Sequence, residues 1–178
     1  KGLGMIFMPN KKEKIEECKS ICEEEAEKLR INKTSWRTVP VNNEILGPLA
    51  KANAPFISQW ILYIDKKDHQ DIERLLFQLR KRIEKKIRES FKNHVGDCEF
   101  YFASLSSKTV VYKGMVRSQI LSEFYEDLKE ESFEVSFSVY HRRFSTNTLP
   151  KWPLAQPMRF LGHNGEINTL LGNINWAK

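Results

Sequence analysis

The chain has 178 residues, of which 40% are hydrophobic and 29% are charged, and its formal net charge is +6. This length and composition suit one soluble domain with a hydrophobic core, and the sequence has no run of about 18 apolar residues that would indicate a membrane span. The first residues form an apolar strand pattern and not a signal peptide. The sequence begins with Lys1 and stops at Lys178 inside a helical pattern, so we expect residues 1–178 to be part of one domain, truncated at both ends.

Strand and helix patterns alternate through the first half of the chain. An apolar stripe at helical spacing predicts an amphipathic helix over Lys12–Arg30, and Cys18 and Cys22 lie on that stripe. We therefore interpret both thiols as core residues and not as metal ligands. The other elements predicted here are a strand over Gly2–Met8, an extended segment over Thr34–Pro40, a short helical region over Glu44–Ala52, a strand over Pro55–Ile64 and a helix over Asp71–Phe91.

The second half is predicted to contain a hairpin, a helix and further strands. Cys98–Leu105 and Thr109–Lys113 flank a serine-rich turn, which is typical of a hairpin. A helix is expected over Ser118–Leu128, with Ser118 as its N-cap. Strict alternation over Phe133–Tyr140 predicts a half-buried strand. A strand over Met158–Gly162 and a helix start over Asn168–Trp176 come next, and the whole pattern indicates mixed α and β structure.

Much of the excess positive charge lies on the helix predicted over Asp71–Phe91. Residues 71–92 contain eight basic and four acidic side chains, while the apolar positions recur at helical spacing. One interpretation is a basic nucleic-acid-binding module. The polar face lacks interleaved aromatic residues, however, and the chain has no recognised RNA-binding motif. We favour a solvated helix face, and we expect no nucleic-acid partner.

Two chemically distinctive elements lie close together near the end of the sequence. Arg142 and Arg143 leave the strand predicted over Phe133–Tyr140, and an arginine fork suits a carboxylate. A surface ion pair is the alternative role for either arginine, and Arg142 fits it better than Arg143. An Asn164-Gly165 turn can present a side-chain amide and a backbone N–H to one oxygen atom, as an oxyanion hole requires. Together they point to acyl transfer on an amino-acid-like substrate.

Longer stretches of the sequence match a known family pattern. These stretches are His141, Arg143, Phe144, Ser145 and Thr146, then Ala155–Met158 and His163–Thr169, and earlier Trp36–Pro40, Leu46-Gly47, Ser104–Thr109 and Val111–Met115. With these residues the chain resembles the class II glutamine amidotransferase domain of the glutamate synthases, an N-terminal-nucleophile (Ntn) hydrolase, in its ferredoxin-dependent form. The resemblance covers nearly the whole chain.

This resemblance implies a fold and a set of site residues. The fold is α+β, a four-layer α-β-β-α sandwich, incomplete here at both ends. Arg143 would bind the α-carboxylate of L-glutamine, and Ser145 and Thr146 would line the glutamine pocket. Asn164 and Gly165 would form the oxyanion hole. The resemblance implies no metal site in this domain.

The nucleophile that the resemblance requires is not found in this sequence. The family uses a cysteine at the mature N-terminus, activated by its own α-amino group. Residue 1 is a lysine, and none of Cys18, Cys22 and Cys98 precedes a plausible cleavage site. The family's aspartate that holds the substrate's amino group would come after the end of this chain. We therefore expect the chain on its own not to hydrolyse glutamine.

The resemblance also implies partners outside these residues. Full-length members carry FMN and an iron–sulfur cluster in other domains, where ferredoxin and 2-oxoglutarate are used; no cofactor is expected in this part. An NAD(P)H-dependent glutamate synthase or another class II amidotransferase is the alternative. The expected location is the plastid stroma, or the cytoplasm of a cyanobacterium, and no membrane partner is expected.

Overall fold

The computed structural model describes residues 1–65, 69–91, 100–144, 149–158 and 174–177. Strands and helices alternate through the first half, as the sequence patterns predict, and short 3-10 helices (η) dominate the second half. The elements in order are β1 (Gly2–Met8), α1 (Lys12–Lys28), β2 (Thr34–Thr38), η1 (Asn43–Ile45), α2 (Pro48–Ala52), β3 (Phe56–Leu62), α3 (His69–Ser90), β4 (Tyr101–Ser106), η2 (Ser118–Ile120), α4 (Leu121–Phe124), η3 (Glu126–Lys129) and η4 (Trp152–Leu154).

The four strands form one antiparallel sheet in the order β2-β3-β1-β4. β1 lies in the interior of the sheet, and its residues Met5 to Met8 are almost completely buried. Such a strand is covered on both faces, which explains why it is a continuous apolar run and does not alternate. Its pairing with β4 shifts register between Met5 and Ile6, so β4 carries a local irregularity beside the centre of the sheet.

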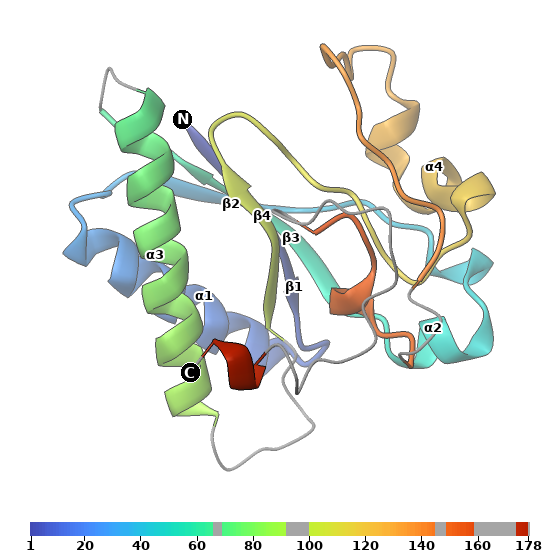
Figure 1. Ribbon diagram of the computed structural model, residues 1–178, viewed down its shortest axis with the longest axis horizontal. Helices are drawn as coiled ribbons and strands as arrows, with labels where there is room; N and C mark the ends of the chain where they lie inside the picture. The colour runs from blue at the N-terminus through green and yellow to red at the C-terminus, as the bar shows by residue number, and fades with distance from the viewer. Residues whose placement is uncertain (66–68, 92–99, 145–148, 159–173, 178) are drawn as a thin grey trace.

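Helices α1 and α3 cover one face of the sheet (Figure 1). Residues that recur every three or four positions along α3 are buried there against β1 and β4, as the amphipathic pattern predicts. Cys18 and Cys22 of α1 lie in the same cluster, which confirms them as core residues. Burial, followed by the nearby charge of Glu23, raises the pKa of the Cys22 thiol well above its usual value.

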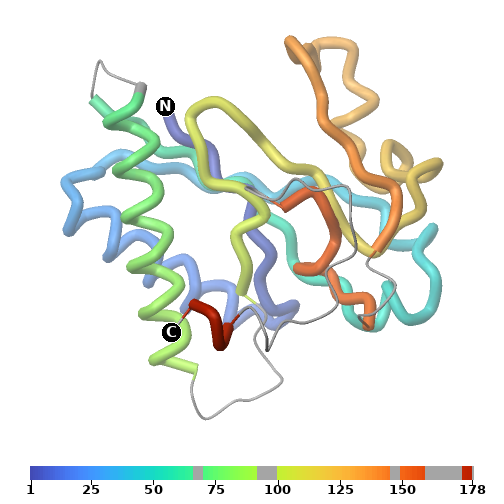
Figure 2. The backbone as a smooth tube through the Cα atoms, viewed as in Figure 1, coloured from blue at the N-terminus to red at the C-terminus, as the bar shows by residue number. Residues whose placement is uncertain are grey.

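The opposite face is covered by α2, α4 and the irregular segments after β4. A second apolar cluster lies there, around Phe7, Phe124, Tyr125 and Trp152. Figure 2 shows the chain after β4 and the chain around η4 on this side, away from α1 and α3. Arg143, the predicted site residue that the structure describes, belongs to this irregular layer.

The helix predicted over Asp71–Phe91 is present as α3, and part of its basic charge is paired within the molecule. Arg80 and Lys81 contact Glu84, and Arg82 contacts Glu25 of α1 at 2.8 Å. The contact between Arg82 and Glu25 joins the two helices that cover the sheet.

The predicted hairpin is wrong in its second strand, because residues 109–113 form no strand. Serine side chains accept hydrogen bonds from backbone N–H groups that would otherwise pair with a neighbouring strand. Ser104 Oγ accepts from Val111 N at 3.1 Å, and Ser106 Oγ accepts from Lys108 N at 3.1 Å. The chain therefore leaves the sheet after β4 and crosses to the irregular layer.

The helix predicted over Ser118–Leu128 is replaced by three short turns, η2, α4 and η3. The N-cap residue of η2 is Arg117, and its side chain makes no capping hydrogen bond. The backbone is instead tied to the segment after β2, because Asn42 N donates to the carbonyl oxygen of Phe124 at 2.9 Å. These tertiary bonds replace the continuous helical ladder that the apolar spacing predicts.

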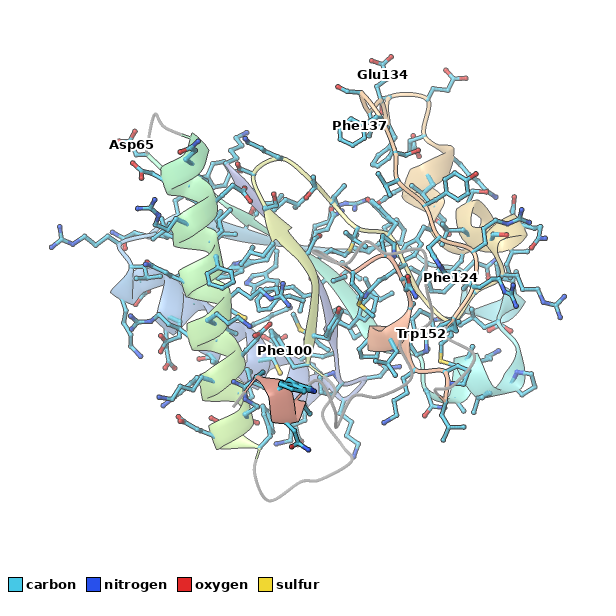
Figure 3. The ribbon with its side chains drawn as sticks, viewed as in Figure 1. Asp65, Phe100, Phe124, Glu134, Phe137 and Trp152 are labelled. Atoms are coloured by element: carbon cyan, nitrogen blue, oxygen red, sulfur yellow. The ribbon has the colours of Figure 1, made fainter. Side chains whose placement is uncertain are left out.

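The strand predicted over Phe133–Tyr140 is also absent, and its apolar residues are exposed. The exposed fractions are 58% for Val135, 76% for Phe137 and 73% for Val139. Figure 3 shows Phe137 with Glu134 on an arm that projects from the rest of the molecule. Alternating apolar residues indicate a segment that can pair with a neighbouring strand and have one of its faces covered. No described strand lies beside residues 133–140 to pair with them.

The described residues form an α+β structure with one sheet, which confirms the class predicted from the sequence at that level. The predicted strand over Met158–Gly162 lies outside the described residues, except for Met158. Of the helix start over Asn168–Trp176, residues 174–176 are described and are helical. Among the helices that the structure describes, none has the length and apolar character to cross a membrane.

Candidate functional site

A pocket of about 350 Å³ lies where the segment entering η2 meets the segment after the projecting arm. Its lining is strongly basic. The lining residues are Arg117, Ser118, Gln119, Arg142 and Arg143. Three of these five side chains are guanidinium groups and none is acidic, so the pocket is suited to an anion.

A hydrogen bond joins the two segments that line the pocket. Arg142 Nε donates to Ser118 Oγ at 3.3 Å, which links the two sides. The backbone N–H of Arg143 donates to His141 Nδ1 at 3.2 Å, a local contact within the second segment. All three arginines are exposed, so a dissolved ligand can reach their guanidinium groups.

A polar network fixes the neighbouring turn η3 to the sheet. Asp127 accepts from Arg37 Nη1 of β2 at 2.8 Å and from the hydroxyl of Tyr112 at 2.9 Å. Gln59 of β3 accepts from Arg37 Nη1 and donates to the hydroxyl of Tyr112. The hydrogen bond from Arg37 holds the pKa of Asp127 below its usual value, and burial raises the pKa of Tyr112. The network holds η3, and with it the turns after η2, in one place.

Lys113 lies under the irregular layer, and only 3% of it is exposed. Its Nζ donates to the Tyr101 hydroxyl and to the carbonyl oxygen of Pro153, each at 3.0 Å. It also lies 3.9 Å from the sulfur atom of Met158. Burial, and then repulsion from Arg80, lowers the pKa of Lys113 to about 8. Lys113 thus ties β4 to the segment 153–158.

Trp152 directly precedes the segment 153–158 and is fixed by contacts of its own. Its indole Nε1 donates to the carbonyl oxygen of Ala50 at 3.2 Å, and its ring packs on Phe7 and Phe124. Phe124 and Trp152 lie close together in Figure 3. A Cβ atom built on Gly114 would lie 2.4 Å from the Trp152 ring, so only glycine allows this approach.

Of the site residues predicted from the sequence, the structure describes Arg143 and places it in the pocket. Ser145, Thr146, Asn164 and Gly165 lie outside the described residues. Arg142 does not form the predicted surface ion pair with any described residue; it binds Ser118 and lines the pocket. Arg117 and Ser118 were not predicted as site residues, because no local pattern connects them with arginines 24 positions away. Within the described ranges, no cluster of three or more His, Cys, Asp or Glu side chains could hold a metal ion.

Comparison with known proteins matches residues 1–178 to the family described as class-II glutamine amidotransferases. Three relatives are similar over almost the whole chain. They are ferredoxin-dependent glutamate synthase, chloroplastic, of Oryza sativa subsp. japonica (48% identical over 178 residues), ferredoxin-dependent glutamate synthase 1, chloroplastic/mitochondrial, of Arabidopsis thaliana (51% over 179) and ferredoxin-dependent glutamate synthase 2 of Synechocystis (50% over 176). These matches cover 98–99% of this chain and 11% of each relative, so the chain spans about a ninth of their length.

Gly114→Ala is expected to destabilise the protein by about 1–3 kcal/mol. The new methyl group would meet the Trp152 ring, which cannot easily move because its Nε1 is hydrogen-bonded to Ala50. Gly47→Ala is the matched control, since nothing lies within 4 Å of its added Cβ. The φ angle of Gly47 is −66°, which alanine adopts without strain, so this variant should remain within about 1 kcal/mol of the wild type. Urea unfolding of both variants measures the difference, and equal losses would contradict the proposed clash.

The free energy of unfolding is expected to rise as the pH rises from about 8 towards 10.5. Over this range the unfolded chain still binds the Lys113 proton while the folded chain has lost it, so a higher pH favours the folded state. The contribution is up to about 3 kcal/mol, since one pKa unit corresponds to about 1.4 kcal/mol.

Lys113→Met should remove this part of the rise in urea titrations at about pH 7 and about pH 10. Lys108→Met, which replaces an exposed lysine in the preceding turn, is the control. Lys113→Met with the same pH dependence as the wild type would show that this ammonium is not the cause.

Proposed function

Because the chain belongs to the class-II glutamine amidotransferase family, we propose that it supplies the glutamine-binding part of a ferredoxin-dependent glutamate synthase. The reaction is the hydrolysis of L-glutamine to L-glutamate and ammonia, and the ammonia then reacts with 2-oxoglutarate elsewhere in the enzyme. The observation that supports this proposal most is the match over 98–99% of this chain to three ferredoxin-dependent glutamate synthases.

Arg143 is proposed to bind the α-carboxylate of L-glutamine. Its position in a pocket without an acidic lining residue supports this role, because its fork is available to a ligand carboxylate. Ser145 and Thr146 follow it in the sequence after Phe144 and are proposed to line the same pocket. Binding the end of glutamine that does not react fixes the orientation of the end that does.

Asn164 and Gly165 are proposed to form the oxyanion hole. The Asn164 amide and the Gly165 N–H would stabilise the charge that develops on the amide oxygen of glutamine during attack. The nucleophile in this proposal is an N-terminal cysteine that lies outside this sequence. Neither Cys18 nor Cys22 suits the role, because both are buried in the core and burial of Cys22 disfavours its thiolate.

The complete fold is proposed to be a four-layer α-β-β-α sandwich, of which residues 1–178 are one part. The sheet described here, with α1 and α3 on its outer face, would supply two of the layers. The exposed alternating residues of the segment 133–140 support a second sheet, because a partner strand would cover them and use their backbone groups.

The other cofactors and partners of the proposed enzyme lie outside this chain. FMN, an iron–sulfur cluster and the ferredoxin and 2-oxoglutarate sites are assigned to other domains. An NAD(P)H-dependent synthase is the alternative, and the names of the relatives favour the ferredoxin-dependent one. Relatives described as chloroplastic, together with one from Synechocystis, support a location in the plastid stroma or in a cyanobacterium.

Arg143→Lys in the complete synthase is expected to raise the KM for L-glutamine by about tenfold or more, because lysine replaces a two-pronged contact with a point charge. Synthesis from added ammonia should be nearly unchanged, since it bypasses the glutamine site. Arg74→Lys, at an exposed position of α3, is the matched control. Equal losses with glutamine and with ammonia would assign Arg143 to folding.

Asn164→Ala is expected to lower kcat for glutamine hydrolysis by about 10²–10³-fold. The KM should change little, because the oxygen carries its full negative charge only near the transition state. Steady-state kinetics measures both constants, while circular dichroism and ammonia-dependent synthesis verify folding. A folded variant with nearly normal turnover would show that Asn164 and Gly165 only form a turn.

A further inference from the structure

The basic pocket contains more positive charge than one α-carboxylate requires. Arg117, Arg142 and Arg143 line the same space, and none of the lining residues is acidic. Within the described part of the chain, no carboxylate pairs with any of the three; the ion pairs found there involve other residues. By contrast, Arg37, Arg80 and Arg82 each contact a carboxylate.

Neighbouring guanidinium groups repel one another, and an anion bound between them offsets this electrostatic repulsion. One carboxylate satisfies one guanidinium fork in a bidentate contact. If Arg143 takes the α-carboxylate, then Arg117 and Arg142 still present donors to the same pocket. The pocket volume of about 350 Å³ is larger than a single carboxylate group needs.

Ser118 links Arg142 to the segment that carries Arg117. Its hydroxyl oxygen accepts from Arg142 Nε at 3.3 Å, so that nitrogen is occupied while the terminal nitrogens of Arg142 are not bound by any described residue. Arg117 directly precedes Ser118 in the chain, at the start of η2. Because Asp127 and its partners hold the following turns on the sheet, the backbone that carries Arg117 is held near the pocket.

We propose that Arg117 and Arg142, joined through Ser118, form a second carboxylate-binding subsite beside Arg143, and that L-glutamate binds across both. This rests on the proposed function, in which L-glutamate is the product and Arg143 binds an α-carboxylate. L-Glutamine has one carboxylate and L-glutamate has two, so only the product can fill both subsites. The second subsite therefore causes product inhibition of glutamine hydrolysis.

The test is the inhibition of glutamine hydrolysis by added L-glutamate in the complete synthase. For Arg117→Gln we expect the inhibition constant of L-glutamate to rise by about 10-fold or more, the loss typical of one charged hydrogen bond. The KM for L-glutamine should rise much less than this inhibition constant, because glutamine has no second carboxylate. Arg142→Gln should act in the same direction. Arg143→Gln should raise both constants, because the α-carboxylate is common to substrate and product.

Arg74→Gln removes an exposed positive charge from α3 and is the control for general electrostatics. Inorganic phosphate, added at the same concentrations as L-glutamate, is the control for unspecific anion binding. The proposal is overturned if phosphate inhibits as strongly as L-glutamate, or if Arg74→Gln weakens inhibition as much as Arg117→Gln does.

Two further results would overturn the second subsite. In one, Arg117→Gln raises the KM for L-glutamine and the inhibition constant equally, which would place Arg117 on the shared α-carboxylate. In the other, neither Arg117→Gln nor Arg142→Gln changes inhibition. If Arg143→Gln leaves the KM unchanged, the proposed role of Arg143 fails, while a raised inhibition constant for Arg117→Gln alone still supports the second subsite.

Discussion

The burial of β1 between β3 and β4, almost complete from Met5 to Met8, positions both layers that cover the sheet. Its alternate side chains enter different clusters: Ile6 packs under α1 and α3, while Phe7 packs against the irregular layer on the other face. Because protein interiors are densely packed, neither cluster can change volume without moving this strand. The helices and the candidate site therefore lie on two sides of one strand.

The two sides of the sheet are stabilised by different means. On the helix side, apolar residues at regular spacing bury surface without needing polar contacts. On the site side, the backbone is irregular, and polar groups such as Asp127 and Lys113 fix it at a few points. Functional residues commonly lie on such loops over a rigid scaffold. The basic pocket follows that rule: its segment at Arg117 precedes the turns that Asp127 fixes, and its segment at Arg142 is hydrogen-bonded to Ser118.

The distribution of charge also differs between the two sides. On the helix side, Arg80 and Arg82 pair with glutamates, and Glu25 accepts from both Lys28 and Arg82. Burial alone would raise the pKa of Glu25, but these hydrogen bonds outweigh it and lower that pKa. The pocket arginines have no such partner among the described residues. Their guanidinium groups are exposed and therefore remain available to a ligand.

Local periodicity and long matching stretches were enough to predict the first half of the fold, the core faces of α1 and α3, and the family. The path of the chain after β4 was decided by tertiary contacts alone. Apolar alternation over residues 133–140 predicts a strand, but a strand also needs a partner, which no local pattern supplies. Arg143 could be predicted from its motif; Arg117 could not, since its place beside Arg142 depends on two distant segments meeting at Ser118.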